Sequence, residues 1–251
     1  MENFEIIRLD TTASTSRWIA ENGRSLPHGA CVTARCQTAG RGQRGNSWEA
    51  APGLNVTLSG LLRPEGIDIS AAFPLSEAVA EAVADTVACL LAQSGVRSDV
   101  KIKWPNDIYV SDKKIAGILI ENSLRGRMVE RSIVGIGLNV NQREFVSDAP
   151  NPVSVFQLTG AEKDVDAVAL HMWRRVMEAV GELAAGGGGA LHDRYMKRLW
   201  RGTGVHAFLD VAAGKRFDAS VADVAPSGHI TLCDAASGSP RVFAFKEIVW
   251  L

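Results

Sequence analysis

The sequence predicts an α+β protein in which a larger region of mixed helices and strands is followed by a small all-β tail. Three observations support this prediction. Two long segments repeat apolar residues at helical spacing, short apolar segments lie on either side of them, and short strands and turns take over after about residue 201. The chain has 251 residues, 46% of them hydrophobic, so it can bury a full core. We expect one domain over residues 1–201 and another over residues 202–251.

Four helices are expected in the first domain. Ser14 or Thr15 can cap a short helix, and Pro74 suits the first turn of a long one. A second long helix begins at Asp164 and stops at four consecutive glycines, which a helix interior does not tolerate. The expected helices span residues 14–23, 74–95, 164–186 and 195–200.

Strand alternation gives the first indication of a binding surface. Residues 134–140 place valine, isoleucine and leucine on one face and Gly135, Gly137 and Asn139 on the other. Two glycines in period two indicate a close approach to the backbone, by a ligand or by a packed helix, and this strand alone favours neither. Residues 115–121 add a third glycine, Gly117. The expected strands span residues 4–9, 54–59, 115–121, 134–140, 205–209, 217–224, 229–233 and 241–249.

The loop at residues 40–45, Gly-Arg-Gly-Gln-Arg-Gly, fits the glycine pattern of dinucleotide-binding turns. The segment after it is too short, and too broken by Pro52 and Gly53, to form the crossover helix of that motif. Arg41 and Arg44 beside exposed backbone amides favour a clamp for a phosphate or carboxylate. The alternative is an ordinary surface turn with two solvated arginines.

Lys103 is the second candidate for chemistry. It precedes Trp104 and Pro105, and the proline restricts the backbone of the residue before it. A lysine fixed in this way can stabilise charge on a transferring phosphoryl or acyl-phosphate group. The alternative is a strand end followed by a polar turn at Asn106 and Asp107.

Composition excludes several classes of protein. The net charge of −1 argues against a nucleic-acid binder. The sequence contains no signal peptide and no apolar run of the roughly 20 residues that cross a bilayer, so we expect a cytoplasmic protein without membrane partners. The four cysteines and five histidines lack metal-ligand spacing, which predicts free thiols and no zinc site. Motifs for serine hydrolases and P-loop nucleotide binding are absent from the sequence.

Four ordered motifs are similar to those of biotin protein ligases. They lie at residues 40–48 (Gly-Arg-Gly-Gln-Arg-Gly-Asn-Ser-Trp), 103–107 (Lys-Trp-Pro-Asn-Asp), 114–119 (Lys-Ile-Ala-Gly-Ile-Leu) and 135–139 (Gly-Ile-Gly-Leu-Asn). The resemblance implies a catalytic domain like that of class II aminoacyl-tRNA synthetases, a mixed sheet with helices mainly on one face, followed by an SH3-like β-barrel. It also implies the form of the family without an N-terminal DNA-binding domain.

The resemblance further implies an activity and its substrates. Such enzymes activate biotin with Mg-ATP to biotinyl-5′-AMP and then transfer biotin to one lysine of the biotin carboxyl carrier domain of a carboxylase. Either a monomer or a homodimer is compatible with the sequence. We expect Mg²⁺ to arrive with ATP, and the sequence assigns no residue to it.

Roles for individual residues follow from the same resemblance. Lys103 and Arg41 are the expected catalytic residues. Contacts with biotin are expected from Ser14, Thr15, Gln37, Gly40, Arg41, Lys103, Gly117, Gly135 and Gly137. Contacts with the nucleotide and its phosphates are expected from Arg41, Arg44, Asn106, Lys114 and Asn139. We expect Trp48 to pack the glycine loop.

Three positions depart from the family pattern. Ser16 replaces an asparagine that many relatives carry, and Gln43 and Asn46 replace arginines. Two other functions remain open. A lipoate-protein ligase shares the fold, but its glycine loop reads Arg-Arg-x-Ser-Gly-Gly-Gly-Ala, which residues 40–47 lack. A non-enzymatic module that binds carboxylic acids explains the arginine clamp but gives Lys103 no role.

Overall fold

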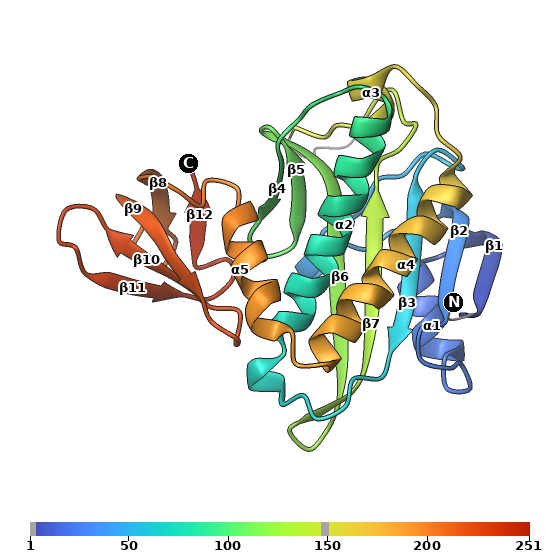
Figure 1. Ribbon diagram of the computed structural model, residues 1–251, viewed down its shortest axis with the longest axis horizontal. Coiled ribbons are helices and arrows are strands. Elements are labelled where there is room, and N and C mark those ends of the chain that lie inside the picture. The colour runs from blue at the N-terminus through green and yellow to red at the C-terminus, as the bar shows by residue number, and fades with distance from the viewer. Residues whose placement is uncertain (1–3, 147–150) are drawn as a thin grey trace.

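The structure is a computed structural model that describes residues 4–146 and 151–251. Its main sheet has seven strands in the order β1-β2-β3-β7-β6-β5-β4 (Figure 1). β1 and β2 run parallel and the other neighbouring pairs run antiparallel, so the predicted mixed sheet is confirmed. The strands are β1 (Ile6–Thr12), β2 (Cys31–Gln37), β3 (Val56–Leu62), β4 (Val100–Lys103), β5 (Asp107–Val110), β6 (Lys113–Arg125) and β7 (Met128–Leu138).

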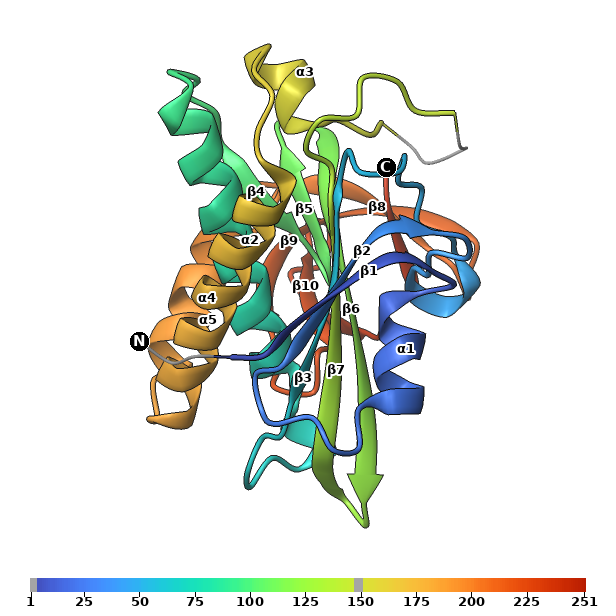
Figure 2. The same cartoon turned by 90° about the vertical axis from the view of Figure 1, so that its right-hand side faces the viewer.

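The long helices gather on one face of this sheet, as predicted. Figure 2 shows α2 (Phe73–Gln93), α4 (Val165–Ala184) and α5 (Gly188–Arg198) on one side and α1 (Thr15–Asn22) on the other. Short helices occur at α3 (Val155–Thr159), η1 (Gln43–Gly45) and η2 (Ile69–Ala71). The face that α1 flanks thus carries one short helix.

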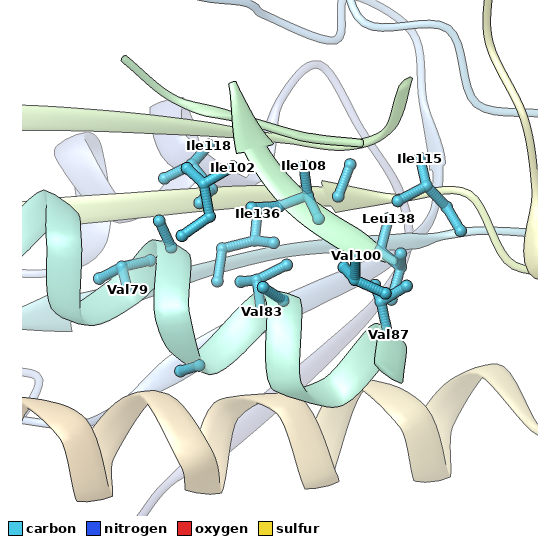
Figure 3. Packing of buried hydrophobic residues seen from close by; sticks show 14 of the residues in the cluster. Val79, Val83, Val87, Val100, Ile102, Ile108, Ile115, Ile118, Ile136 and Leu138 are labelled. Carbon is cyan, nitrogen blue, oxygen red and sulfur yellow. The ribbon is translucent and has the colours of Figure 1, made fainter. Parts of the chain in front are cut away.

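Burial under α2 determines which face of each central strand points away from the helices. Val79, Val83 and Val87 of α2 point toward Ile136 and Leu138 of β7 (Figure 3), and all five are at most 2% exposed. Fully burying each such side chain contributes about 1.5–3 kcal/mol. The predicted phase of residues 134–140 is confirmed, because the glycines of β7 then face the opposite side.

The all-β tail forms a second, antiparallel sheet in the order β11-β10-β9-β8-β12. Aromatic rings fill its interior, with centroids 4.6 Å apart for Phe208 and Trp250 and 5.7 Å for Phe208 and Phe217, as expected of an SH3-like barrel. The strands are β8 (His206–Asp210), β9 (Lys215–Val224), β10 (Ile230–Asp234), β11 (Pro240–Phe243) and β12 (Ile248–Trp250).

Some boundaries differ from the sequence prediction. The single strand expected over residues 241–249 is two strands, because Lys246 adopts a φ of 72° and Glu247 N–H bonds the Ala244 carbonyl. Gly188 and Gly189 begin α5, although a stop was expected there. Glycine is tolerated at a helix start, and the buried residues Leu191 and Tyr195 anchor this helix. The short elements β2, β5 and α3 were not predicted, and β4 was considered only as the alternative strand end before the turn at Asn106 and Asp107.

Buried carboxylates join α2 to α5 and to the tail. His192 of α5 lies between Glu77 of α2 and Asp223 of β9, with nitrogen–oxygen distances of 2.9 and 3.1 Å. One turn further along α2, Arg198 donates to Glu81 at 3.1 Å. Glu77 and Glu81 are 2% and 5% exposed, so these contacts compensate part of the cost of burying their charge.

This cluster predicts stability that falls as the pH rises. Burial raises the pKa of Glu81 from 4.5 to about 7, although Arg198 opposes the shift, and burial also raises the pKa of Glu77. Burial disfavours the charge on His192, but its contacts with Glu77 and Asp223 outweigh this and raise its pKa. The folded state therefore holds protons that the unfolded state releases. We expect the free energy of unfolding to decrease between about pH 5 and 8.

Urea denaturation across this range measures the effect. Glu81→Gln should remove roughly 3 kcal/mol of this total decrease in the free energy of unfolding, since one pKa unit corresponds to about 1.4 kcal/mol. Glu162→Gln, which breaks the exposed pair with Arg143, is the control and should leave the slope unchanged. A Glu81→Gln protein with the parental slope would contradict the assignment.

Candidate active site

A cleft of about 870 Å³ lies on the face of the main sheet opposite α2. Its floor comes from β3, β6 and β7, and one end comes from the start of α1. The loop at residues 41–49 and the end of the tail, residues 248–250, complete its walls. The cleft thus lies where both sheets and the glycine loop meet.

The three predicted glycines form the floor of this cleft. Gly137 of β7 lies opposite Gly117 of β6, and Gly135, also on β7, lies opposite Ser59 of β3. A Cβ atom built at Gly135 would come no closer than 3.5 Å to other atoms. A larger side chain there would extend into the open cleft.

Trp48 lies on this floor, which adds to its expected role of packing the glycine loop. A Cβ atom at Gly137 would lie 2.3 Å from Cε2 of the Trp48 ring, and one at Gly117 would lie 3.1 Å from Cζ3. Only the missing side chains allow the indole to approach so closely. The backbone N–H of Trp48 donates to the Gly40 carbonyl at 3.1 Å, so Trp48 also closes the glycine loop. The period-two glycines signalled a close approach, but not which group made it.

A polar network closes one end of the cleft. Gln37 Oε1 accepts hydrogen bonds from the backbone N–H of Thr15 at 2.8 Å and from its hydroxyl at 3.1 Å. Ser59 therefore donates to Thr15 Oγ1, 2.8 Å away, because that hydroxyl has one proton. Ser14 occupies the cap position of α1, but its hydroxyl bonds Ser16 at 3.0 Å instead. The structure thus brings Ser14, Thr15 and Gln37 together. The side-chain amide of Gln37, at the end of β2, accepts from a backbone N–H at the start of α1 that has no partner within the helix.

The glycine loop is folded on itself and tied to the sheet. Gly42 N–H bonds the Asn46 carbonyl at 2.7 Å. The Arg41 guanidinium donates to both carboxylate oxygens of Glu121 on β6, at 2.7 and 3.1 Å. Gly40 faces the backbone of Trp48, because a Cβ atom built at Gly40 would lie 2.5 Å from the Trp48 carbonyl oxygen. The side chain of Arg44 lies outside the described part of the structure.

Lys103 reaches the cleft from the end of β4, whose other face is buried. Its Nζ donates to the Tyr109 hydroxyl at 3.3 Å and lies 5.0 and 4.8 Å from the ring centroids of Tyr109 and Trp200. Burial lowers the pKa of Lys103, although the Asp107 carboxylate opposes this. Among the described residues Lys103 has no ion-pair partner, whereas Lys114 pairs with Asp107 at 2.6 Å.

The two asparagines differ in how their amides are used. Asn106 donates from Nδ2 to the Ile118 carbonyl at 2.8 Å, so this amide holds the turn between β4 and β5 against β6. Asn139 is 3% exposed and donates to the Val153 carbonyl at 3.0 Å. Its Oδ1 is buried and, within the described residues, has no hydrogen-bond donor. Asn139 thus lines the cleft with an amide whose acceptor is unused within the described residues.

Several cleft residues were not predicted. The cleft is also lined by Tyr109, Phe245 and Trp250, and the Trp200 ring packs against the Lys103 ammonium group. Their positions depend on how the tail contacts the main sheet, which local sequence signals do not reveal. In residues 4–146 and 151–251 no three His, Cys, Asp or Glu side chains are grouped to hold a metal ion. No helix in those ranges has the length and apolar character needed to cross a membrane.

Comparison with known proteins supplies the family. The model of the biotin/lipoate A/B protein ligase family matches residues 8–139. The biotin–[acetyl-CoA-carboxylase] ligase of Paracoccus denitrificans is 35% identical over 185 residues, which cover 69% of this chain and 74% of that protein. The bifunctional ligase/repressor BirA of Bacillus subtilis is 35% identical over 169 residues, or 65% of this chain and 49% of that protein. The chain thus spans about half the length of BirA.

Solved structures show the same fold. The biotin protein ligase of Aquifex aeolicus in complex with biotin and ATP has a TM-score of 0.78 at 23% identity, over 98% of this chain and 97% of that one. The biotin protein ligase of Leishmania major in complex with biotinyl-5-AMP has a TM-score of 0.64 at 21% identity, over 96% of this chain and 98% of that one. With the family model covering more than half of the sequence, the chain belongs to the biotin/lipoate A/B protein ligase family.

Proposed function

We propose that the protein is a biotin protein ligase, which forms biotinyl-5′-AMP from biotin and Mg-ATP and transfers biotin to a lysine of a biotin carboxyl carrier domain. One observation carries the proposal. One row of paired residues crosses five neighbouring strands of the main sheet. It runs from Thr57 through Gly137, Gly117 and Asp107 to Lys103. The row crosses four strand spacings of about 4.8 Å, or roughly 19 Å. A bicyclic ring, an alkyl chain and an acyl phosphate match this length, and binding along the row displaces the Trp48 indole from Gly117 and Gly137.

The polar end of the cleft suits the ureido group of biotin. Ser14, Thr15 and Gln37 together offer donors and an acceptor, as a ring with one carbonyl and two N–H groups requires. The glycine floor then admits the thiophane ring and the valeryl chain. The carboxylate of biotin would lie toward Lys103.

Lys103 is the proposed catalytic residue of adenylation. A carboxylate oxygen of biotin attacks the α-phosphorus of ATP, the bond to the bridging oxygen breaks, and pyrophosphate leaves. The Lys103 ammonium stabilises the negative charge that develops between carboxylate and α-phosphate, and partial burial strengthens that interaction. In the second step the amine of the carrier lysine attacks the acyl carbon and AMP leaves.

The nucleotide contacts are proposals as well. The available Oδ1 of Asn139 can accept a hydrogen bond from the amino group of adenine. Arg41, Arg44 and Lys114 would contact phosphates, while Asn106 acts by holding the turn after Lys103. Mg²⁺ would be held by the phosphates of ATP and supply electrostatic stabilisation of their charge.

We also propose the division into residues 1–201 and 202–251, with the tail completing the site. Phe245 and Trp250 line the cleft, and Trp104 Nε1 donates to the Gly228 carbonyl at 3.1 Å. A cytoplasmic location fits the use of ATP and the free cysteines of the described chain.

Pyrophosphate release tests the function directly. We expect release when ATP is mixed with biotin, little release with lipoate, and none without a carboxylic acid. Labelled biotin should then appear on a carrier domain and remain bound after denaturation. Release with lipoate alone would identify a lipoate ligase, and no release with either acid would favour a binding module.

Lys103→Ala should lower the rate of adenylation about 10²–10³-fold, as expected when one preorganised charge is removed from a transition state. Single-turnover pyrophosphate release measures this rate. Lys101→Ala is the matched control on the same strand, because Lys101 pairs with Asp99 at the surface. Near-normal release by the Lys103 variant, with its melting temperature unchanged, would exclude the assigned role.

The glycine floor gives a paired prediction. Gly135→Val should abolish biotin binding in calorimetry, because the new side chain enters the cleft. Ile136→Val, on the buried face of the same strand, should cost about 0.5–1.5 kcal/mol of stability and leave binding intact. The reverse result would mean that biotin lies elsewhere.

A further inference from the structure

The Arg41–Glu121 ion pair bridges two parts of the cleft that are far apart in the sequence. The two terminal guanidinium nitrogens of Arg41 donate to the two carboxylate oxygens of Glu121, at 2.7 and 3.1 Å. This two-point geometry fixes the direction of the arginine as well as its distance. Since Arg41 lies in the glycine loop and Glu121 on β6, the pair fixes the loop against the sheet.

Strand alternation places Glu121 on the cleft side of β6. Gly117 and Leu119 line the cleft, and Glu121 is the next residue in the same phase. Four residues along a strand span about 13 Å, so Glu121 lies well away from the row that leads from Gly117 to Lys103. Arg41 is therefore held at a distance from the proposed phosphate position.

The described cations of the cleft fall into two groups. Lys114 and Arg41 each contact a carboxylate, Asp107 in one case and Glu121 in the other. Lys103 contacts only a hydroxyl and aromatic rings among the described residues. A phosphate group that enters the cleft must compete with a carboxylate for Arg41, but not for Lys103.

We propose that Glu121 is a positioning residue that holds Arg41, and with it the glycine loop, until a phosphate of ATP or of biotinyl-AMP displaces its carboxylate. This role rests on the proposed function. The side chains are 42% and 35% exposed, and ion pairs exposed to this degree are weak. Phosphate therefore displaces the carboxylate readily, and the loop changes partner without a large energetic cost.

Glu121→Gln should release Arg41 and strengthen anion binding. Calorimetric titration with inorganic pyrophosphate should give an affinity about 1.4-fold to fivefold higher than that of the parent, the range over which a weak exposed ion pair competes. In the Arg41→Ala background the same substitution should change the affinity little, because no arginine is left to release. In turnover the KM for ATP should fall by a similar factor while kcat changes little.

Glu130→Gln is the matched control. It removes the exposed pair with Arg125 beside the turn of the same β6–β7 hairpin and should leave pyrophosphate affinity unchanged. If Glu121→Gln raised the affinity equally in the parent and in the Arg41→Ala background, Glu121 would act through its own charge and the proposal would be overturned. No gain in the parental background would overturn it too.

The outcome can be separated from that of the proposed function. Pyrophosphate binding requires no turnover, so the coupling between Glu121 and Arg41 can be measured even in a protein that makes no adenylate. Coupling without adenylation would refute the ligase activity and retain the ion-pair exchange. Adenylation without coupling would refute the role of Glu121 alone.

Discussion

The structure depends on one constraint, the burial of a single face of β7 under α2. Ile136 and Leu138 are almost fully enclosed, and because side chains alternate along a strand, Gly135 and Gly137 must face the other way. A register shift of one residue would bury the glycines and expose the isoleucine. The open floor of the cleft and the hydrophobic core are thus two consequences of the same packing.

The cleft arranges its cations by two physical means. Carboxylates pair with Lys114 and Arg41, so an incoming anion has to exchange with a carboxylate at these side chains. Aromatic rings flank Lys103, which is partly buried and has a lowered pKa. A partly buried cation without a counter-ion interacts strongly with an incoming anion.

The tail belongs to the same packed body as the main sheet. Trp200 and Trp250 have ring centroids 5.4 Å apart, and the His192 cluster connects α2, α5 and β9. Residues that follow the tail's last turn reach back to the cleft wall. The tail at the end of the chain therefore shapes the cleft on the main sheet.

The sequence by itself determined the mixed α+β class, the long helices, the all-β tail and the phase of β7, because these follow from local periodicity. Ordered motifs also singled out the glycines, Lys103 and the polar start of α1 as site residues. Tertiary structure alone decided that Trp48 lies on Gly137, that Glu121 holds Arg41 and that Trp200 supports Lys103. These contacts join residues 80 or more positions apart, and their geometry depends on how strands pair and sheets pack, for which local spacing carries no signal.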